Sequence, residues 1–149
     1  MIVSMFAVSV IAQPETEAIV KGKAVVIVDG IRTSGRAVFD IDLVDSTVKF
    51  GFGDYEDLDP EEGGGENWLY GWIITDVVEQ GKVTVITALP QPYVEDPLDY
   101  AFPGPVPILI LFRGIDSIIE GRTPVTAMGS DFATGDSLMF SGKVLELDI

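Results

Sequence analysis

The alternation of apolar and polar residues with a period of two constrains this chain most strongly. From Ile31 to Leu43 the odd positions are mostly apolar and the even ones mostly polar, and the pattern recurs at Val48–Phe52 and Val83–Thr87. Because successive side chains of a strand point to opposite faces, these segments predict strands with one buried and one solvated face. Two runs that are apolar on both faces, Ala24–Val28 and Val106–Phe112, predict strands covered on both sides.

Glycines mark the expected turns between these strands. Five of the nine Lys and Arg residues directly follow a glycine, and each such pair opens a run of alternating or β-branched residues. Glycine supplies the positive φ that tight hairpins require. We therefore expect turns at Asp29-Gly30, Ser34-Gly35, Gln80-Gly81, Glu120-Gly121 and Ser141-Gly142. About nine to ten strands result, which predicts an all-β fold: an antiparallel β-sandwich (jelly-roll or Ig-like) or a barrel.

Two segments interrupt the strand pattern. Residues 54–66 contain seven carboxylates and three consecutive glycines, and residues 90–107 contain six of the nine prolines. A proline cannot donate a hydrogen bond to a sheet, so the second segment is not a central strand. We expect both to be long loops, which in compact domains are often functional.

Composition excludes several function classes. The 149 residues suffice for one domain, with 24 Asp and Glu against 9 Lys and Arg, no His, no Cys and a net charge of −15. Such a charge argues against nucleic acid as a partner, because phosphate binding needs clustered cations. No apolar run approaches the roughly 18–20 residues of a membrane-spanning helix. Without His, Cys or a phosphate-binding loop, we expect no enzyme and no cofactor, apart from the calcium considered below.

The first twelve residues are apolar except for two serines, and a polar hinge follows them. As a strand, this segment would present apolar side chains on both faces and would need covering on both sides. We expect it to complete the sheet of a neighbouring copy, as an inter-subunit strand. The alternative is the apolar region of a secretory signal, although no Lys or Arg precedes it. The chain then divides into an assembly strand (1–12), a hinge (13–17) and a β domain (18–149), and the assembly residues are Ile2, Val3, Met5, Phe6, Val8, Val10 and Ile11.

The acidic loop is a candidate cation site. Its acids at alternating positions resemble the oxygen spacing of a calcium loop, but Glu62 stands where an EF-hand requires glycine. A less regular calcium site would use Asp54, Asp57, Asp59 and Glu62. The alternative is a solvated loop that keeps the molecule soluble.

Three aromatic residues alternate at Trp68, Tyr70 and Trp72. On a strand their rings would project from one face at intervals of about 6.8 Å, a spacing that suits a platform for stacking sugars. The alternative is that they are core or interface residues, since each buries a large area.

These features favour a structural function. We expect a self-assembling subunit of an extracellular or cell-surface filament or sheath, whose partner is another copy of the chain. The alternative is a secreted acidic glycan- or calcium-binding β-sandwich module.

Overall fold

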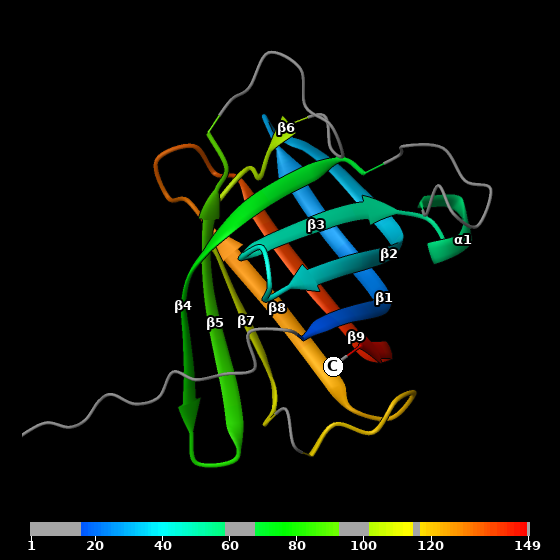
Figure 1. The fold of residues 1–149 in the computed structure, drawn as a ribbon. Helices are drawn as coiled ribbons and strands as arrows, with labels where there is room; N and C mark the ends of the chain where they lie inside the picture. Colours follow the sequence, from blue (N-terminus) through cyan, green and yellow to red (C-terminus); the bar gives the residue numbers. More distant parts are fainter. Residues whose placement is uncertain (1–15, 59–67, 93–101, 115–116, 149) are drawn as a thin grey trace, which may run out of the picture.

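A computed structural model describes residues 16–58, 68–92, 102–114 and 117–148. Within them the chain forms nine strands and one single-turn helix (Figure 1). In chain order these elements are β1 (Glu17–Val28), β2 (Ile31–Asp42), β3 (Thr47–Phe52), α1 (Tyr55–Leu58), β4 (Tyr70–Gln80), β5 (Val83–Pro90), β6 (Phe102–Pro103), β7 (Ile108–Arg113), β8 (Pro124–Ser130) and β9 (Ser137–Asp148). None of the described helices is long and apolar enough to cross a membrane.

The strands form one sheet that closes on itself as a barrel. Their order is β3-β2-β1-β9-β8-β7-β5-β4-β6, and a pairing of β3 with β4 completes a ring of eight antiparallel strands. The two-residue strand β6 adds to β4 in parallel, outside the ring. The all-β prediction and its barrel alternative are confirmed. The sandwich alternative is wrong, because the β3–β4 pairing joins the sheet into one ring instead of leaving two facing sheets.

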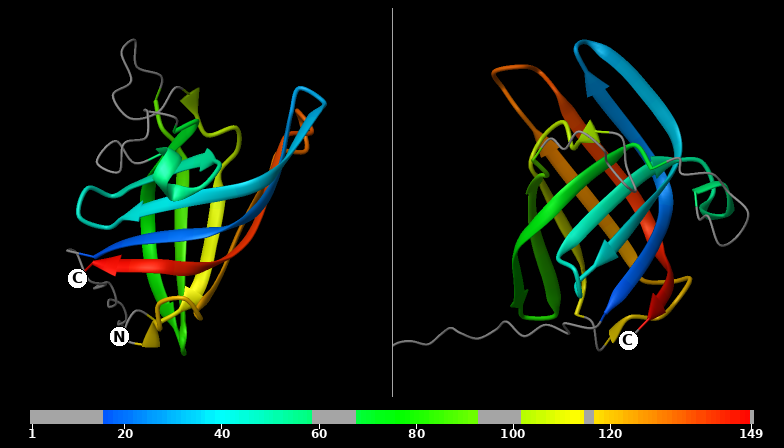
Figure 2. Two further views of the ribbon diagram at one scale, coloured as in Figure 1. Left: turned by 90° about the vertical axis from the view of Figure 1, so that its right-hand side faces the viewer. Right: turned by 45° about the horizontal axis from the view of Figure 1, so that its top comes forward.

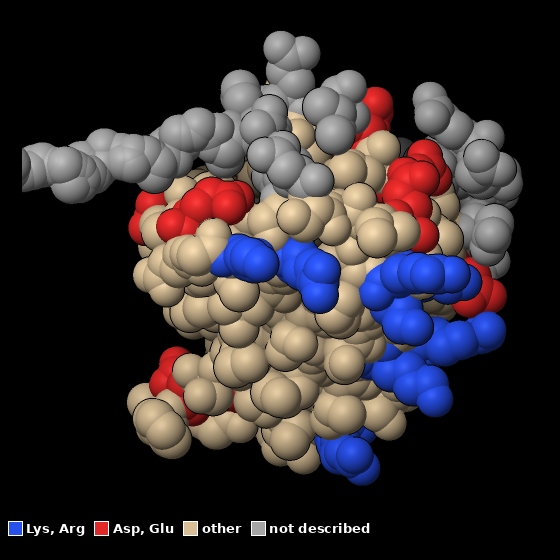
Figure 3. Space-filling view, turned by 90° about the horizontal axis from the view of Figure 1, so that it is seen from below, with Lys and Arg blue, Asp and Glu red and all other residues tan. Residues whose placement is uncertain are grey.

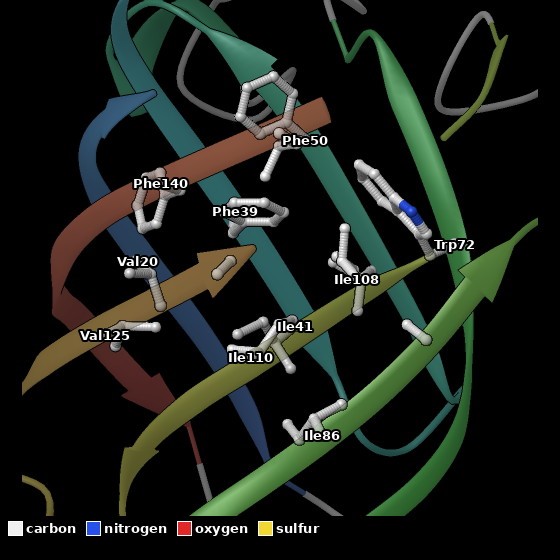
Figure 4. Packing of buried hydrophobic residues seen from close by; sticks show 14 of the residues in the cluster. Val20, Phe39, Ile41, Phe50, Trp72, Ile86, Ile108, Ile110, Val125 and Phe140 are labelled. Atoms are coloured by element: carbon white, nitrogen blue, oxygen red, sulfur yellow. The ribbon is translucent and has the colours of Figure 1, made fainter. Parts of the chain in front are cut away.

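The interior is filled by large apolar side chains (Figure 4). An eight-stranded barrel is just wide enough for side chains to fill it. Aromatic rings pack there in tilted and edge-to-face pairs; the Phe39 ring centroid lies 4.9 Å from that of Phe50 and 4.8 Å from that of Phe140. Each strand of the ring contributes at least one buried side chain: Val20, Phe39, Phe50, Trp72, Ile86, Ile110, Val125 and Phe140.

Three of the five predicted turns are confirmed. Gly30 and Gly81 have positive φ in the turns that follow β1 and β4, and Gly121 has positive φ in the turn before β8. The turns predicted at Ser34-Gly35 and Ser141-Gly142 are wrong, because both pairs lie inside strands. Gly142 is there for another reason: it pairs with Gly22 of β1, where a Cβ on Gly22 would collide with the backbone of β9.

The hairpin of β1 and β2 extends past the part of the ring that holds β3. β1 and β2 pair from Glu17↔Asp42 up to Val28↔Ile31, whereas β3 pairs only with Ala37–Asp42 of β2. Figure 2 shows this hairpin, in blue and cyan, projecting beside the orange connection between β8 and β9. A hydrogen bond from the Asp29 amide to Asp136 Oδ1 (3.0 Å) joins the two tips.

Candidate functional site

The first half of β2 is an open strand edge. Within the described part of the chain, Ile31–Arg36 has a partner strand on the β1 side alone. A strand edge with unpaired backbone groups is a template for pairing with another chain. We call residues 31–36 the open edge.

The direction of the backbone groups on this edge follows from the hairpin turn. Asp29 and Gly30 both have positive φ, so Val28 and Ile31 close a tight two-residue hairpin and exchange hydrogen bonds. Backbone groups then alternate between the two sides of β2, and the Arg36 carbonyl accepts from the Gly53 amide on the side away from β1 (2.8 Å). By the same alternation, Arg32 and Ser34 direct their N–H and C=O groups toward the open side.

An apolar pocket lies on the inner side of the open edge. Its volume is about 300 Å³, and residues of β1, β2 and β3 line it together with Leu69 and Tyr70. The apolar side chains include Val28, Ile31 and Phe52. Burial, followed by the charge of Asp136, raises the pKa of Tyr70, one of the residues that line this pocket. An added strand would therefore find an apolar surface on this side.

The outer side of the same hairpin is basic. On it, cross-strand pairing places Lys21 opposite Lys143 and Lys23 opposite Arg36. Like charges that lie directly opposite each other destabilise a sheet. Among the described residues, the only ion pair made by these cations joins Arg36 to Asp54 (3.3 Å), and it is exposed. With Arg32, five of the nine basic residues thus gather on one face of a chain whose net charge is −15. Figure 3 shows Lys and Arg side chains gathered toward the side on which β1, β2 and β9 lie in Figure 1.

A groove of about 680 Å³ crosses this basic face. Its lining includes three of the cations and the side chains of outward-facing residues on four neighbouring strands: Lys23, Val25, Arg32, Ser34, Arg36, Thr126, Met139 and Ser141. In the sequence Lys23 and Arg36 each follow a glycine, but this spacing does not predict that the cations lie together. The alternation Lys21-Gly22-Lys23 was a signal for two cations on one face. The cross-strand register that adds the others is not visible in the sequence.

The two hairpin tips beside the site carry exposed apolar side chains. Ile31 is 70% exposed and Phe132, in the connection between β8 and β9, is 100% exposed. The second connection is held by its own hydrogen bonds, among them those from the Ala133 amide to Asp131 Oδ1 and between the backbones of Asp131 and Asp136. The exposed phenyl ring is therefore presented by an ordered turn.

The predicted aromatic platform does not form. Trp72 is 0% exposed and points into the barrel, where its Nε1 donates to the Val106 carbonyl (2.8 Å). Trp68 is 5% exposed and precedes β4; it packs outside the ring with Val38 and Leu58. Tyr70 packs partly against the barrel core. The expectation of three rings on one face is wrong because residue 68 lies before the strand begins. Both tryptophans are buried, as the alternative interpretation expected.

The other predicted sites lie largely outside the described residues. The assembly strand, residues 2–11, does so entirely, as do Asp59 and Glu62 of the proposed cation site. Asp54 forms an ion pair with Arg36 (3.3 Å). Among the described residues, no group of three or more carboxylates is placed to hold a metal ion.

A buried carboxyl at Asp40 is a feature that the sequence analysis left unassigned. It faces outward from β2 opposite Lys49, whose Nζ lies 3.9 Å from Asp40 Oδ2 and 5.1 Å from the centroid of the Trp68 ring. Burial, then the hydrogen bond and charge of Glu17, raise the pKa of Asp40 to about 8, although Lys49 acts in the opposite direction. Burial of Asp40 therefore favours its protonated form.

Comparison with known proteins adds little to this description. No protein-family model matches the chain, and no curated protein sequence matches it. Among solved structures, it is similar to the vaccine antigen transferrin binding protein B from Haemophilus parasuis Hp5, seen in a tryptophan-to-alanine mutant. The identity is 13% and the TM-score 0.41, and the match covers 93% of this chain but 28% of the antigen. The chain thus spans less than a third of that protein.

Proposed function

We propose that this protein is a non-enzymatic structural subunit that self-associates outside the cell or at its surface by strand addition. In this proposal, residues 2–11 of one copy pair with the open edge of the next. The observation that supports it is the open edge itself, whose Arg32 and Ser34 direct backbone donors and acceptors away from β1. Backbone hydrogen bonds of this kind provide affinity in known strand additions, and alternate side chains provide specificity.

The closed ring changes what the added strand does. Every strand of the ring lies between Glu17 and Asp148, so a donor strand does not replace a missing core strand. It extends the sheet at an edge. The free energy of association must then come from backbone hydrogen bonds and from the surfaces on either side of that edge.

Those surfaces suit the two faces of residues 2–11. In an extended conformation one face carries Ile2, Ser4, Phe6, Val8 and Val10, and the other carries the small residues Ala7 and Ser9 together with Val3, Met5 and Ile11. We place Phe6 and Val8 toward the apolar pocket beside Ile31, and the small residues beside Arg32 and Arg36. Burying side chains of this size contributes several kcal/mol at about 25 cal/mol per Å².

Strand addition of this kind is head to tail. The donor segment and the open edge are different surfaces, so each added copy leaves a new donor and a new edge available. Unless the rotation between copies closes a ring, such contacts build filaments. This supports a filament or sheath as the product.

The test compares two substitutions at one edge position in the full chain. Ser34→Pro removes an amide that faces the open side and leaves the β1 pairing of Thr33 and Gly35 in place, whereas Ser34→Ala keeps the amide. We expect Ser34→Ala to assemble and Ser34→Pro to stay monomeric, as measured by light scattering after size exclusion and by negative-stain microscopy. Circular dichroism checks that both variants are folded.

Two results would reject strand addition at this edge. One is filament formation by Ser34→Pro to the same extent as by Ser34→Ala. The other is a full-length chain that remains monomeric at all concentrations tested.

The glycan alternative has lost its proposed platform, since both tryptophans are buried. The calcium alternative stays a prediction, because two of its four ligands lie outside the described residues.

A further inference from the structure

A row of apolar side chains crosses the outer face of the barrel. The cross-strand partners Val25, Met139, Met128 and Leu109 belong to four successive strands, β1, β9, β8 and β7. Met139 is 53% exposed, and Met128 and Leu109 are also more than a third exposed. Neighbouring strands lie about 4.8 Å apart, so the row is roughly 14 Å long. These apolar side chains do not belong to the core, which the inward-facing residues of the same strands fill.

The row ends among cations. On β2, the residue opposite Val25 is Ser34, and Arg32 and Arg36 stand two positions to either side of it on the same face. Lys23 lies opposite Arg36. Three positive charges, those of Arg32, Arg36 and Lys23, therefore surround the Ser34 hydroxyl, which is itself a hydrogen-bond donor. The groove of about 680 Å³ includes these residues together with Val25 and Met139.

Without a ligand, the facing like charges at the cationic end of the row, formed by Arg32, Arg36 and Lys23, destabilise the sheet. The like-charged neighbours Lys23 and Arg36 repel each other, and the ion pair of Arg36 with Asp54 is exposed and therefore contributes little. A bound anion would offset that repulsion. Arg side chains are suited to it, since their fork of donors matches a carboxylate.

We propose that this groove binds a free single-chain anionic amphiphile, of the fatty-acid class. Its carboxylate lies at Ser34 between Arg32, Arg36 and Lys23, and its hydrocarbon chain follows Val25, Met139 and Met128 across the strands. The groove volume lies within the range of small-molecule sites, which are apolar with a few placed polar groups. The site uses outward side chains of β1, β2, β8 and β9, so it does not depend on strand addition at the edge of β2.

A free amphiphile fits better than a membrane or a polymer. A chain of net charge −15 is repelled by an anionic bilayer, and this repulsion extends over a Debye length of about 8 Å at physiological salt. A polyanion would contact the cations Arg32, Arg36 and Lys23 but would leave the adjoining apolar row of Val25, Met139 and Met128 uncovered. An amphiphile with one anionic head group and one hydrocarbon chain matches a cluster of cations beside an apolar row.

Isothermal titration calorimetry with dodecanoate, kept below its critical micelle concentration, tests the site. We expect one molecule to bind per chain. Acetate, which has the head without the tail, and dodecyl maltoside, which has the tail without the charge, should each bind at least tenfold more weakly.

Matched variants then locate the binding. Arg32→Gln with Arg36→Gln should weaken dodecanoate binding at least tenfold, and Met139→Ser severalfold. Lys82→Gln with Arg122→Gln removes the same charge from exposed positions outside the groove and should leave the affinity within about twofold. All these side chains are exposed, so the variants should fold.

Several outcomes would overturn the proposal. Dodecanoate that does not bind, that binds both double variants equally, or that binds no better than dodecyl maltoside would each do so. Binding to phosphatidylglycerol vesicles without binding of free dodecanoate would assign the face to a membrane. Binding of a polyglutamate peptide alone would assign it to an acidic protein partner.

Discussion

The interior of the barrel and the outer face of β1, β2, β9 and β8 are built from the same strands, yet they differ in almost every property. Inward residues such as Phe39 and Phe140 are closely packed and fully buried (Figure 4). Outward residues on the neighbouring positions include the facing like charges Lys23 and Arg36 and an exposed methionine, Met139. The inward side of these strands therefore provides stability, and the outward side exposes the side chains on which the proposed binding depends.

The same contrast holds along β2. Its second half, Ala37–Asp42, has a strand on each side, and all but one of its residues are buried. Its first half is exposed throughout and has β1 as its described partner. A closed ring would need only the second half. The extra length of β2 is therefore a feature that closure of the ring does not require.

The largest effect should come from removing a ring from the interior. Trp72→Ala deletes a fully buried side chain and leaves the Val106 carbonyl without its donor, so we expect the free energy of unfolding to fall by about 3–5 kcal/mol. Met139→Ser on the outer face should change it by no more than about 0.5 kcal/mol. Urea denaturation measures both. Similar losses in the two variants would contradict the division between an inner and an outer function.

A smaller effect should come from Asp40, the buried acid on the outward side. Its pKa is about 8 in the folded protein against an ordinary value of 3.8, so between these pH values the folded protein holds more protons than the unfolded chain. The free energy of unfolding should therefore fall as the pH rises through that interval. Asp40→Asn mimics the protonated carboxyl, so it should flatten this decline and raise the free energy of unfolding at pH 7 by roughly 2–4 kcal/mol.

Thermal or urea unfolding between pH 4 and 8 checks this prediction. Asp76→Asn, at an exposed position of β4, is the matched control for loss of one acid. Parallel stability profiles for the parent chain and Asp40→Asn would show that Asp40 is ionised in the folded state.

The smallest effect should come from the like-charged pair on the outer face. Lys143→Glu would place a carboxylate opposite Lys21 and should raise the free energy of unfolding by up to about 1 kcal/mol. Lys82→Glu, at an exposed turn, makes the same change in net charge without such a partner and should give no gain. The difference should shrink at 1 M salt, since salt screens exposed charges. No difference between the two variants would mean that the facing lysines do not repel each other.

Much of the fold could be predicted from the sequence because alternation is a local property. The pattern in Ile31–Leu43 correctly assigned Ala37, Phe39 and Ile41 to the core. Alternation could not reveal that residues 31–36 extend beyond β3, since their exposure depends on where another strand ends. Turn glycines could be predicted because a positive φ is a local requirement of the turn. Gly142 is required instead because the backbone of β1 approaches it closely, and this approach is a tertiary feature.

The candidate site was harder to predict from the sequence, because it depends on strand pairing and not on a local pattern. Lys21, Lys23, Arg36 and Lys143 are scattered over more than a hundred residues, and only the register of β1 with β2 and β9 brings them together. The alternation of Trp68, Tyr70 and Trp72 was misleading because β4 starts at Tyr70, so Trp68 is not bound by the strand periodicity. The residue types alone indicated cations on strand faces, but the pairing of β1 with β2 and β9 determines where those cations lie.

Residue-resolved hydrogen exchange tests the central claim, that assembly occurs at the open edge, most directly. Assembled full-length protein is compared with a chain lacking residues 1–12, after quenching and dissolution for NMR. The account predicts that the Arg32 and Ser34 amides exchange at least tenfold more slowly in the assembled protein, while Thr33 and Gly35, which bond to β1, are protected in both. Equal exchange of Arg32 and Ser34 in the two samples would contradict it.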